Sequence, residues 1–162
     1  MKKLIAFYSR AGENYTSSGL ADLKVGNTQV VAEKLKELTG ADIFKIEQVN
    51  EYSKDYYTCT QEAQRDQKTN ARPELKHYLE SIDDYDEIYL CYPNFWGTMP
   101  MAVWTFLENY DFSNKIIKPL CTHEGSGMGR SESDIKKLCP NAKIESGLAI
   151  FINFFSEFQF NS

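Results

Sequence analysis

Short apolar segments alternate with segments of helical periodicity along most of the chain. Residues 3–9 (KLIAFYS) form an almost continuous apolar run, which is typical of a central parallel strand covered on both faces. Residues 41–49 alternate apolar and polar positions, as expected for a strand nearer the edge of a sheet. Three further strands are predicted at 86–92, 115–122 and 144–151.

Helical patterns lie between these strands. The first helix is predicted at 28–38, with Gly40 as its C-terminal stop. A second is predicted to begin at Pro73, because the apolar residues that follow have the i, i+3, i+4, i+7 spacing of one helix face. These residues are Leu75, Tyr78, Leu79 and Ile82.

Two more helices are predicted in the second half of the chain. Pro100 begins one of them. Ser131-x-x-Asp134 resembles a capping box that opens the other, and Pro140 ends it. Residues 50–72 are polar and predict a loop with a weak helix.

The alternation of strands and helices predicts an α/β fold with a parallel sheet, right-handed crossovers and helices on both faces. The length of 162 residues fits a single domain. In such sheets ligands bind beyond the carboxyl ends of the strands, where the strand order reverses. The loops after the first, third and fourth strands are therefore the candidate binding loops.

Composition narrows the class of protein. Hydrophobic residues make up 42% and charged residues 25%, which is typical of a globular domain. The formal charge of −5 argues against nucleic acid as a partner and is compatible with docking onto basic proteins. No segment approaches the roughly 20 apolar residues of a membrane helix. The opening MKKLIAFYSR has too short an apolar run for a signal peptide.

The four cysteines indicate a reducing compartment. Cys59, Cys91, Cys121 and Cys139 are far apart and form no C-x-x-C pair, so we expect free thiols and a cytoplasmic protein. Cys121-x-His123 alone is too small a ligand set for a structural zinc ion.

The first candidate loop runs from Ser9 to a helix start at Gly26-Asn27-Thr28. Hydroxyl groups, backbone N–H groups and the positive end of a helix dipole can bind a phosphate there without lysine or arginine. Ordinary capping of the helix by Asn27 or Thr28 is the alternative.

The second candidate loop, 92–101 (YPNFWGTMPM), brings Phe95 and Trp96 to the same sheet edge. A flat heteroaromatic ligand would give these rings a stacking partner, although Trp96 could instead cover the core between two helices.

The third candidate loop, 121–133 (CTHEGSGMGRSES), contains three glycines that permit close backbone approach or positive φ. Its spacing lacks the third glycine of a dinucleotide fingerprint, and a flexible turn is the plainer interpretation. His123 in this loop is a candidate proton donor or anion stabiliser, whereas His77 is expected on the surface or in packing.

Taken together, the three loops resemble the flavodoxin family over residues 2–150. The matching segments are Ser9-Arg10, Gly26-Asn27-Thr28, 92–113 and 121–150. The resemblance implies a flavodoxin-like three-layer sandwich with a five-stranded parallel sheet in the order 2-1-3-4-5. It also implies noncovalent binding of FMN.

The family's binding residues carry over position by position. The phosphate loop would comprise Ser9, Asn27 and Thr28, with Arg10 and Gly26 adjoining. The loop that flanks the isoalloxazine would comprise Pro93, Asn94, Phe95, Trp96 and Gly97. The loop at the pyrimidine edge would comprise Thr122, His123, Glu124, Gly125 and Gly127.

Two departures from the family pattern stand out. Residues 11–25 split the phosphate loop, and Val25 stands where the family has a threonine, so Tyr15, Thr16, Ser17 and Ser18 are candidates for the missing hydroxyl. The tail, 151–162, has five phenylalanines where the family has a terminal helix, so this helix is expected to be absent or altered. The sheet face it would cover then invites association, for example as a homodimer.

The function implied is electron transfer by an FMN-binding protein, with redox partners that present basic surfaces or with a small electron acceptor. The alternatives are an FMN-dependent NAD(P)H quinone or nitro reductase, and a flavodoxin-fold binding module without a cofactor.

Overall fold

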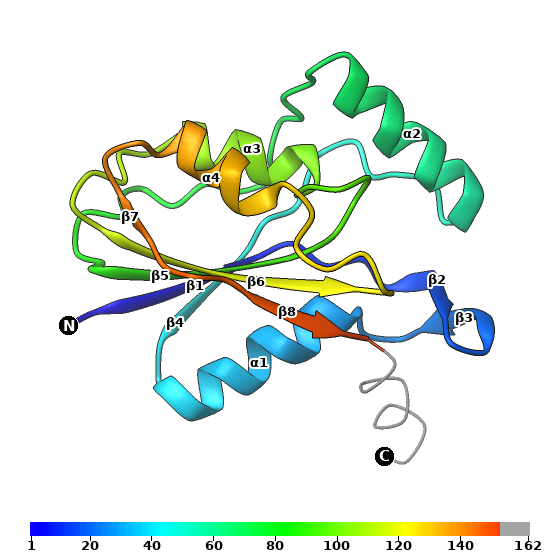
Figure 1. The fold of residues 1–162 in the computed structure, drawn as a ribbon, viewed down its shortest axis with the longest axis horizontal. Helices are drawn as coiled ribbons and strands as arrows, with labels where there is room; N and C mark the ends of the chain where they lie inside the picture. The colour runs from blue at the N-terminus through cyan, green and yellow to red at the C-terminus, as the bar shows by residue number, and fades with distance from the viewer. Residues whose placement is uncertain (153–162) are drawn as a thin grey trace.

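Parallel strands form the centre of the molecule, which the computed structural model describes over residues 1–152 (Figure 1). In spatial order the strands are β4 (Asp42–Lys45), β1 (Lys3–Phe7), β5 (Glu87–Pro93), β6 (Ile116–His123) and β7 (Lys143–Ile144), with β8 (Leu148–Phe151) also paired to β6. Each of these pairings is parallel. Counted along the chain, the order is 2-1-3-4-5, which confirms the predicted topology.

Helices cover both faces of the sheet, so the three-layer α/β sandwich is also confirmed (Figure 1). One face carries α1 (Asn27–Thr39), and the other carries α2 (Tyr56–Lys68), α3 (Met101–Glu108) and α4 (Ser131–Leu138).

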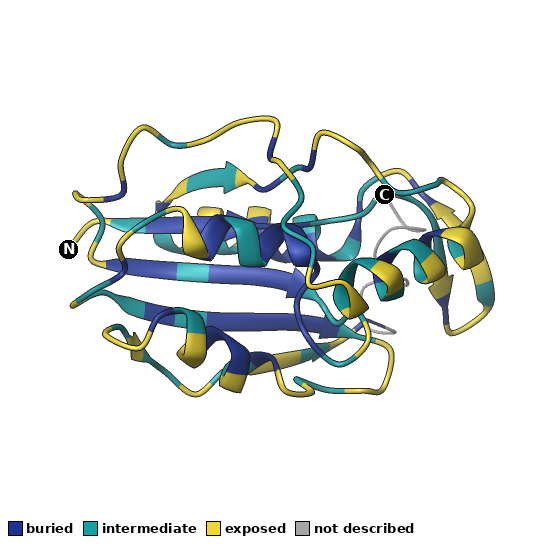
Figure 2. Ribbon diagram, turned by 90° about the horizontal axis from the view of Figure 1, so that it is seen from above, coloured by how far each residue is buried: buried dark blue, intermediate teal, exposed yellow. Residues whose placement is uncertain are grey.

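The side chains of β1 explain its unbroken apolar run. Ile5 and Phe7 join a cluster with Val31 of α1, whereas Leu4 and Ala6 join the larger cluster on the opposite face. Figure 2 shows the central strands buried between the layers. A strand buried on both faces needs apolar residues at consecutive positions.

The helix predicted from Pro73 is wrong, because this segment is irregular and contains only a single β-bridge, at Leu75. Its backbone pairs with the chain after β4: Lys76 N–H donates to the Glu47 carbonyl and Val49 N–H to the Glu74 carbonyl, both at 2.8 Å. Leu75 is buried at the bridge to that chain segment. Long-range pairing therefore replaces the internal hydrogen bonds that a helix would have made.

The preceding segment holds a regular helix where a loop with a weak helix was predicted. The Asp55 carboxylate accepts the Thr58 N–H at 2.8 Å and caps α2 at its N-terminus. Cys59 and Ala63, one turn apart, are its buried residues.

The predicted fifth strand, 144–151, is divided into β7 and β8. Both halves pair with β6, but the register shifts by one residue between Ile117↔Ile144 and Leu120↔Leu148. Residues 145–147 leave the ladder opposite Lys118 and Pro119, and Pro119 has no N–H to donate to a ladder.

The predicted atypical tail begins within the part of the chain that the structure describes. β8 ends at Phe151, and residues 153–162 lie outside the described residues, so the absence of a terminal helix and the homodimer stay predictions. Among residues 1–152, none of the helices is long and apolar enough to cross a membrane. All four cysteines are buried free thiols.

Candidate functional site

The loops that follow β1, β5 and β6 meet at one edge of the sheet and line a pocket of about 460 Å³. Ten of the predicted binding residues line it: Arg10, Asn27, Thr28, Pro93, Asn94, Phe95, Trp96, Thr122, His123 and Glu124. The remaining five belong to the same loops but do not line the pocket; they are Ser9, Gly26, Gly97, Gly125 and Gly127.

The two ends of the first loop are in direct contact although 16 residues lie between Ser9 and Gly26 in the sequence. Ser9 Oγ accepts the N–H of Gln29 at 3.0 Å and so binds a donor in the first turn of α1. A Cβ atom at Gly26 would lie 2.1 Å from Ser9 Oγ and 2.7 Å from the carbonyl oxygen of Arg10. Only glycine allows this approach of the strand end to the helix start.

The polar groups next to this contact face the pocket. Thr28 and Thr122 are buried, and their hydroxyl oxygens are hydrogen-bonded at 2.8 Å, which joins the first loop to the third. Asn27 Oδ1 is buried and has no hydrogen-bond partner among residues 1–152. Because buried polar atoms are normally paired, this oxygen is available to accept a hydrogen bond from a donor on a ligand.

The residues that split the loop form an antiparallel hairpin of β2 (Gly12–Thr16) and β3 (Gly19–Leu23), which lies beyond the sheet edge (Figure 1). Its pocket residue is Asn14. The hydroxyl of Thr16 instead donates to the Gly19 carbonyl at 2.7 Å, inside the hairpin.

Two side chains, one in the hairpin and one just before it, contact α2 and the segment that leads into it. The Arg10 guanidinium donates to the carbonyl oxygens of Glu13, Ser53 and Lys54, the last two at 3.0 Å. The Glu13 carboxylate accepts the N–H of Tyr56 at 2.9 Å. The guanidinium of Arg10 is thus occupied by backbone carbonyls at the wall of the pocket.

The second loop contains a tight turn with Trp96 and Gly97 at its centre. Both have positive φ, of 55° and 89°, and Phe95 and Thr98 pair on either side of them. Asn94 fixes the base of the turn, since its Oδ1 accepts the Gly97 N–H at 2.8 Å. Positive φ at both central residues is the geometry of a type I′ turn.

The indole of Trp96 lies against α2 and remains 48% exposed. Its Nε1–H donates to the carbonyl of Thr60 at 2.8 Å. The core-lid alternative considered from sequence would require a buried ring, so this exposure favours the pocket interpretation.

The third loop packs against the second. Gly125, Gly127 and Gly129 all have positive φ, as the sequence analysis allowed. The Asn94 amide donates to the Gly127 carbonyl at 2.8 Å, and the Arg130 N–H donates to the Gly97 carbonyl at 2.7 Å. The second and third loops therefore form one polar unit.

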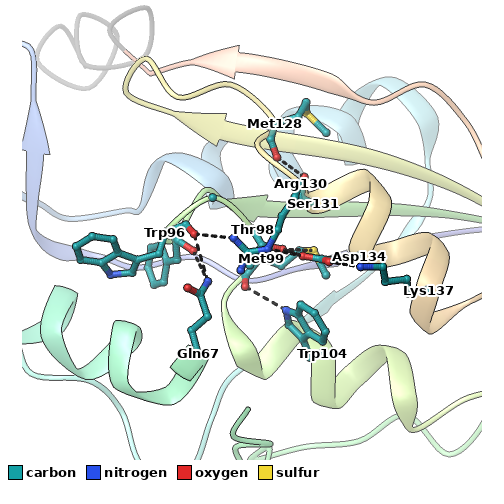
Figure 3. Close-up of polar contacts among 12 residues, drawn as sticks. Gln67, Trp96, Thr98, Met99, Trp104, Met128, Arg130, Ser131, Asp134 and Lys137 are labelled. Atoms are coloured by element: carbon teal, nitrogen blue, oxygen red, sulfur yellow. Dashed lines mark hydrogen bonds and ion pairs between the residues drawn. The ribbon is translucent and has the colours of Figure 1, made fainter. Parts of the chain in front are cut away.

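The capping box predicted at the start of α4 is wrong. Arg130 is the N-cap residue and makes no side-chain cap. Ser131 is buried, where its hydroxyl donates to the Met128 carbonyl and accepts from the Tyr92 hydroxyl, at 2.7 and 2.8 Å. The Asp134 carboxylate turns toward the second loop instead (Figure 3).

The wall opposite the third loop was missed by the sequence analysis. It comes from α2, whose Tyr56, Tyr57, Cys59, Thr60 and Ala63 line the pocket; Ser126 and Ile152 complete the lining. The signal available was Asp55 as an N-cap, followed by Cys59 and Ala63 at helical spacing.

Comparison with known proteins agrees with this architecture. The family model for flavodoxin matches residues 2–156 of the sequence. The chain belongs to the flavodoxin family. No curated protein matches it.

Solved structures with the same fold come from several bacteria. A protein of Bacteroides eggerthii DSM 20697, described as a flavoprotein, is 24% identical, with a TM-score of 0.75 over 99% of each chain. A flavoprotein of Lactobacillus acidophilus NCFM in complex with FMN is 18% identical, with a TM-score of 0.68 over 96% of this chain and 97% of that one. These likenesses establish a shared fold.

Proposed function

We propose that this chain binds FMN in the pocket formed by its three loops and acts in electron transfer. The observation that carries the proposal is the cradle at the start of α1. There Gly26 brings the strand end against the helix, Thr28 and Thr122 supply hydroxyls, and the unpaired buried Oδ1 of Asn27 can accept a hydrogen bond from a hydroxyl of the cofactor. Membership of the flavodoxin family supports the same conclusion.

The residues present suit each part of this cofactor. The α1 N-terminus with Asn27 and Thr28 would hold the phosphate, because its free N–H groups and dipole favour an anion. Trp96 and Phe95 would bind the apolar ring system. When bound, FMN would supply the electron transfer, and the chain would orient it and limit its contact with water.

A purified sample titrated with FMN and with riboflavin tests the proposal. Flavin absorbance and quenching of flavin fluorescence report binding, and riboflavin lacks the phosphate that the α1 cradle is proposed to recognise. Tighter binding of FMN than of riboflavin is expected. Protein that binds neither flavin would refute the proposal and favour the binding module without a cofactor.

Thr28→Val is expected to weaken FMN binding about tenfold while changing riboflavin binding little. The substitution keeps the shape of the side chain but removes a hydroxyl, a loss worth about 1 kcal/mol or somewhat more next to a charged group. Thr105→Val is the matched control, because that hydroxyl donates within α3 to Met101. Equal weakening of both flavins by Thr28→Val would contradict a phosphate role.

Glu124 is expected to make FMN binding weaker as the pH rises through about 7. Glu124 is an exposed residue at the pocket, and partial burial of its carboxyl group raises the pKa to about 7. Above that pH the charged carboxylate repels the anionic cofactor. In Glu124→Gln this component of the pH dependence of the Kd should disappear, whereas Glu37→Gln, at an exposed ion pair on α1, should retain it.

The raised pKa of Glu124 also makes the free energy of unfolding depend on pH. The folded-state pKa of Glu124 is higher than its ordinary value of 4.5, so the folded protein retains the proton more strongly. Its contribution to the free energy of unfolding is therefore largest below about pH 4.5 and falls as the pH rises to about 7. Glu124→Gln should remove this fall, which denaturant unfolding at several pH values measures.

A reductase acting on small molecules is the second candidate, and the α2 wall favours it. Tyr56 and Tyr57 line the pocket, Tyr57 is 61% exposed, and the hairpin places the Tyr15 ring 6.1 Å from that of Tyr56. These rings offer an apolar surface to a quinone or nitroaromatic compound. Steady NADPH oxidation with a quinone supports the reductase, whereas activity that requires a separate reductase supports the carrier.

A protein partner would be recognised by charge in the carrier case. The net charge of −5 favours a redox partner with a basic surface, and the rate of electron exchange should then fall with added salt. The free thiols of the chain support a cytoplasmic location.

A further inference from the structure

A buried carboxylate lies directly behind the Trp96–Gly97 turn. The side chain of Asp134 is 5% exposed, and its Oδ2 accepts the hydroxyl of Thr98 at 2.6 Å (Figure 3). The same oxygen lies 3.3 Å from Nε of Arg130, and Oδ1 lies 3.9 Å from Nζ of Lys137. A buried charge requires such partners, because it is otherwise strongly unfavourable.

Arg130 extends this contact to the rest of the turn. Its backbone N–H donates to the Gly97 carbonyl at 2.7 Å, and its Nη1 donates to the Trp96 carbonyl at 3.4 Å. Together with the Thr98 hydroxyl bound by Asp134, the pair contacts three consecutive residues of the turn. Gln67 of α2 adds a donor to the Trp96 carbonyl at 3.3 Å (Figure 3).

The turn needs such support because of its conformation. Trp96 has a φ of 55°, which a bulky side chain adopts only at an energetic cost. A residue held in this region persists when surrounding contacts determine it. The half-exposed indole is itself held by one hydrogen bond, to the Thr60 carbonyl, so its place also depends on the contacts that hold the backbone of the turn.

We propose that Asp134 and Arg130 are positioning residues that fix the Trp96–Gly97 turn and thereby the Trp96 indole at the pocket. The Asp134 carboxylate orients the Arg130 guanidinium and the Thr98 hydroxyl, and these two groups bind the turn. The effect of these two residues on FMN binding rests on the proposed function. Their effect on the position of Trp96 can be measured in the protein without any cofactor.

Trp96 fluorescence in the cofactor-free protein tests the proposal. The chain has two tryptophans, so Trp104→Phe leaves Trp96 as the sole emitter. In this background Asp134→Asn retains the size of the side chain but removes its charge. We expect acrylamide quenching of Trp96 to rise about twofold and its anisotropy to fall, because the freed turn exposes the ring and increases its motion.

Lys137→Gln is the matched control. Lys137 approaches the same carboxylate, but its side chain is 75% exposed and makes no contact with the turn, so quenching of Trp96 should not change. Arg130→Gln should reproduce the Asp134→Asn result, and Arg130→Lys should restore part of the protection. Thermal unfolding of each variant shows whether it is folded.

The outcomes separate the two proposals. A folded Asp134→Asn protein with unchanged Trp96 quenching overturns the positioning role. If that variant does not fold, Arg130→Gln, at a half-exposed side chain, decides the question by the same measurement. An FMN titration then gives the effect on the cofactor, expected as an affinity about tenfold lower for Asp134→Asn. Failure of the parent protein to bind FMN refutes the proposed function and leaves the Trp96 result standing.

Discussion

Gly26→Ala is expected to lower the affinity for FMN about 100-fold and to destabilise the fold. The new Cβ would lie 2.1 Å from Ser9 Oγ and 2.7 Å from the Arg10 carbonyl oxygen, and the latter belongs to backbone that has no alternative rotamer. Overpacking of this kind costs about 1–3 kcal/mol, and here the displaced atoms form the proposed phosphate cradle. FMN titration and denaturant unfolding measure the two effects.

Gly147→Ala is the matched control for this prediction. Its Cβ would also meet an atom closely, at 2.4 Å, but that atom is Cε of Met128 at the end of a flexible side chain, and the nearest backbone atom, the Pro119 carbonyl oxygen, is 3.3 Å away. Stability and FMN affinity should therefore change little. A Gly26→Ala protein that binds FMN as tightly as the parent would show that the contact between Ser9 and Gly26 has no part in binding.

Gly129→Ala is expected to destabilise the protein by about 3 kcal/mol and to weaken FMN binding. The added Cβ would lie 2.2 Å from the Gly97 carbonyl oxygen, so the second and third loops would have to separate. The left-handed conformation at a φ of 55° adds about 1 kcal/mol for a residue with a side chain. Denaturant unfolding measures the first effect.

Gly40→Ala separates the two causes. Gly40 has a comparable φ of 68° at the end of α1, but a Cβ there meets no atom within 4 Å. It should show the conformational cost alone, about 1 kcal/mol, and leave FMN binding unchanged. Equal destabilisation by the two substitutions would mean that contact between the loops contributes nothing to stability.

The sheet was predictable because its central strands can be recognised from their own residues. β1 is buried on both faces, so Leu4, Ile5, Ala6 and Phe7 are all apolar, and this pattern depends little on the rest of the chain. The three loops were predictable because strand ends in a parallel sheet meet at one edge. Ten of the fifteen predicted site residues accordingly line one pocket.

The errors arose where distant residues determine local structure. Leu75 and Ile82 have helical spacing and both are buried, yet Leu75 lies where residues 74–76 pair with residues 47–49, and Ile82 precedes a turn. Ser131 and Asp134 have the spacing of a capping box. However, the Ser131 hydroxyl is hydrogen-bonded to Tyr92, and the Asp134 carboxylate is hydrogen-bonded to Thr98. Neither partner is adjacent in sequence, so local pattern could not distinguish these cases.

The α2 wall was missed for the opposite reason. The helix buries only Cys59 and Ala63 along its length, so its apolar stripe is narrow and its sequence reads as polar. Its position depends on Arg10 and Glu13, which reach it from beyond the first strand. Such contacts become visible only when the fold brings the two segments together.

The contact between Ser9 and Gly26 also determines how the chain can vary in length. Since the two ends of the excursion already touch, the residues between them form a closed loop that projects from the sheet edge and contacts α2 through Glu13. Loop closure depends only weakly on the number of residues enclosed. The hairpin is thus a permissive insertion point, where segments of different length can be exchanged and the shape of the pocket mouth altered while the cradle beneath is preserved.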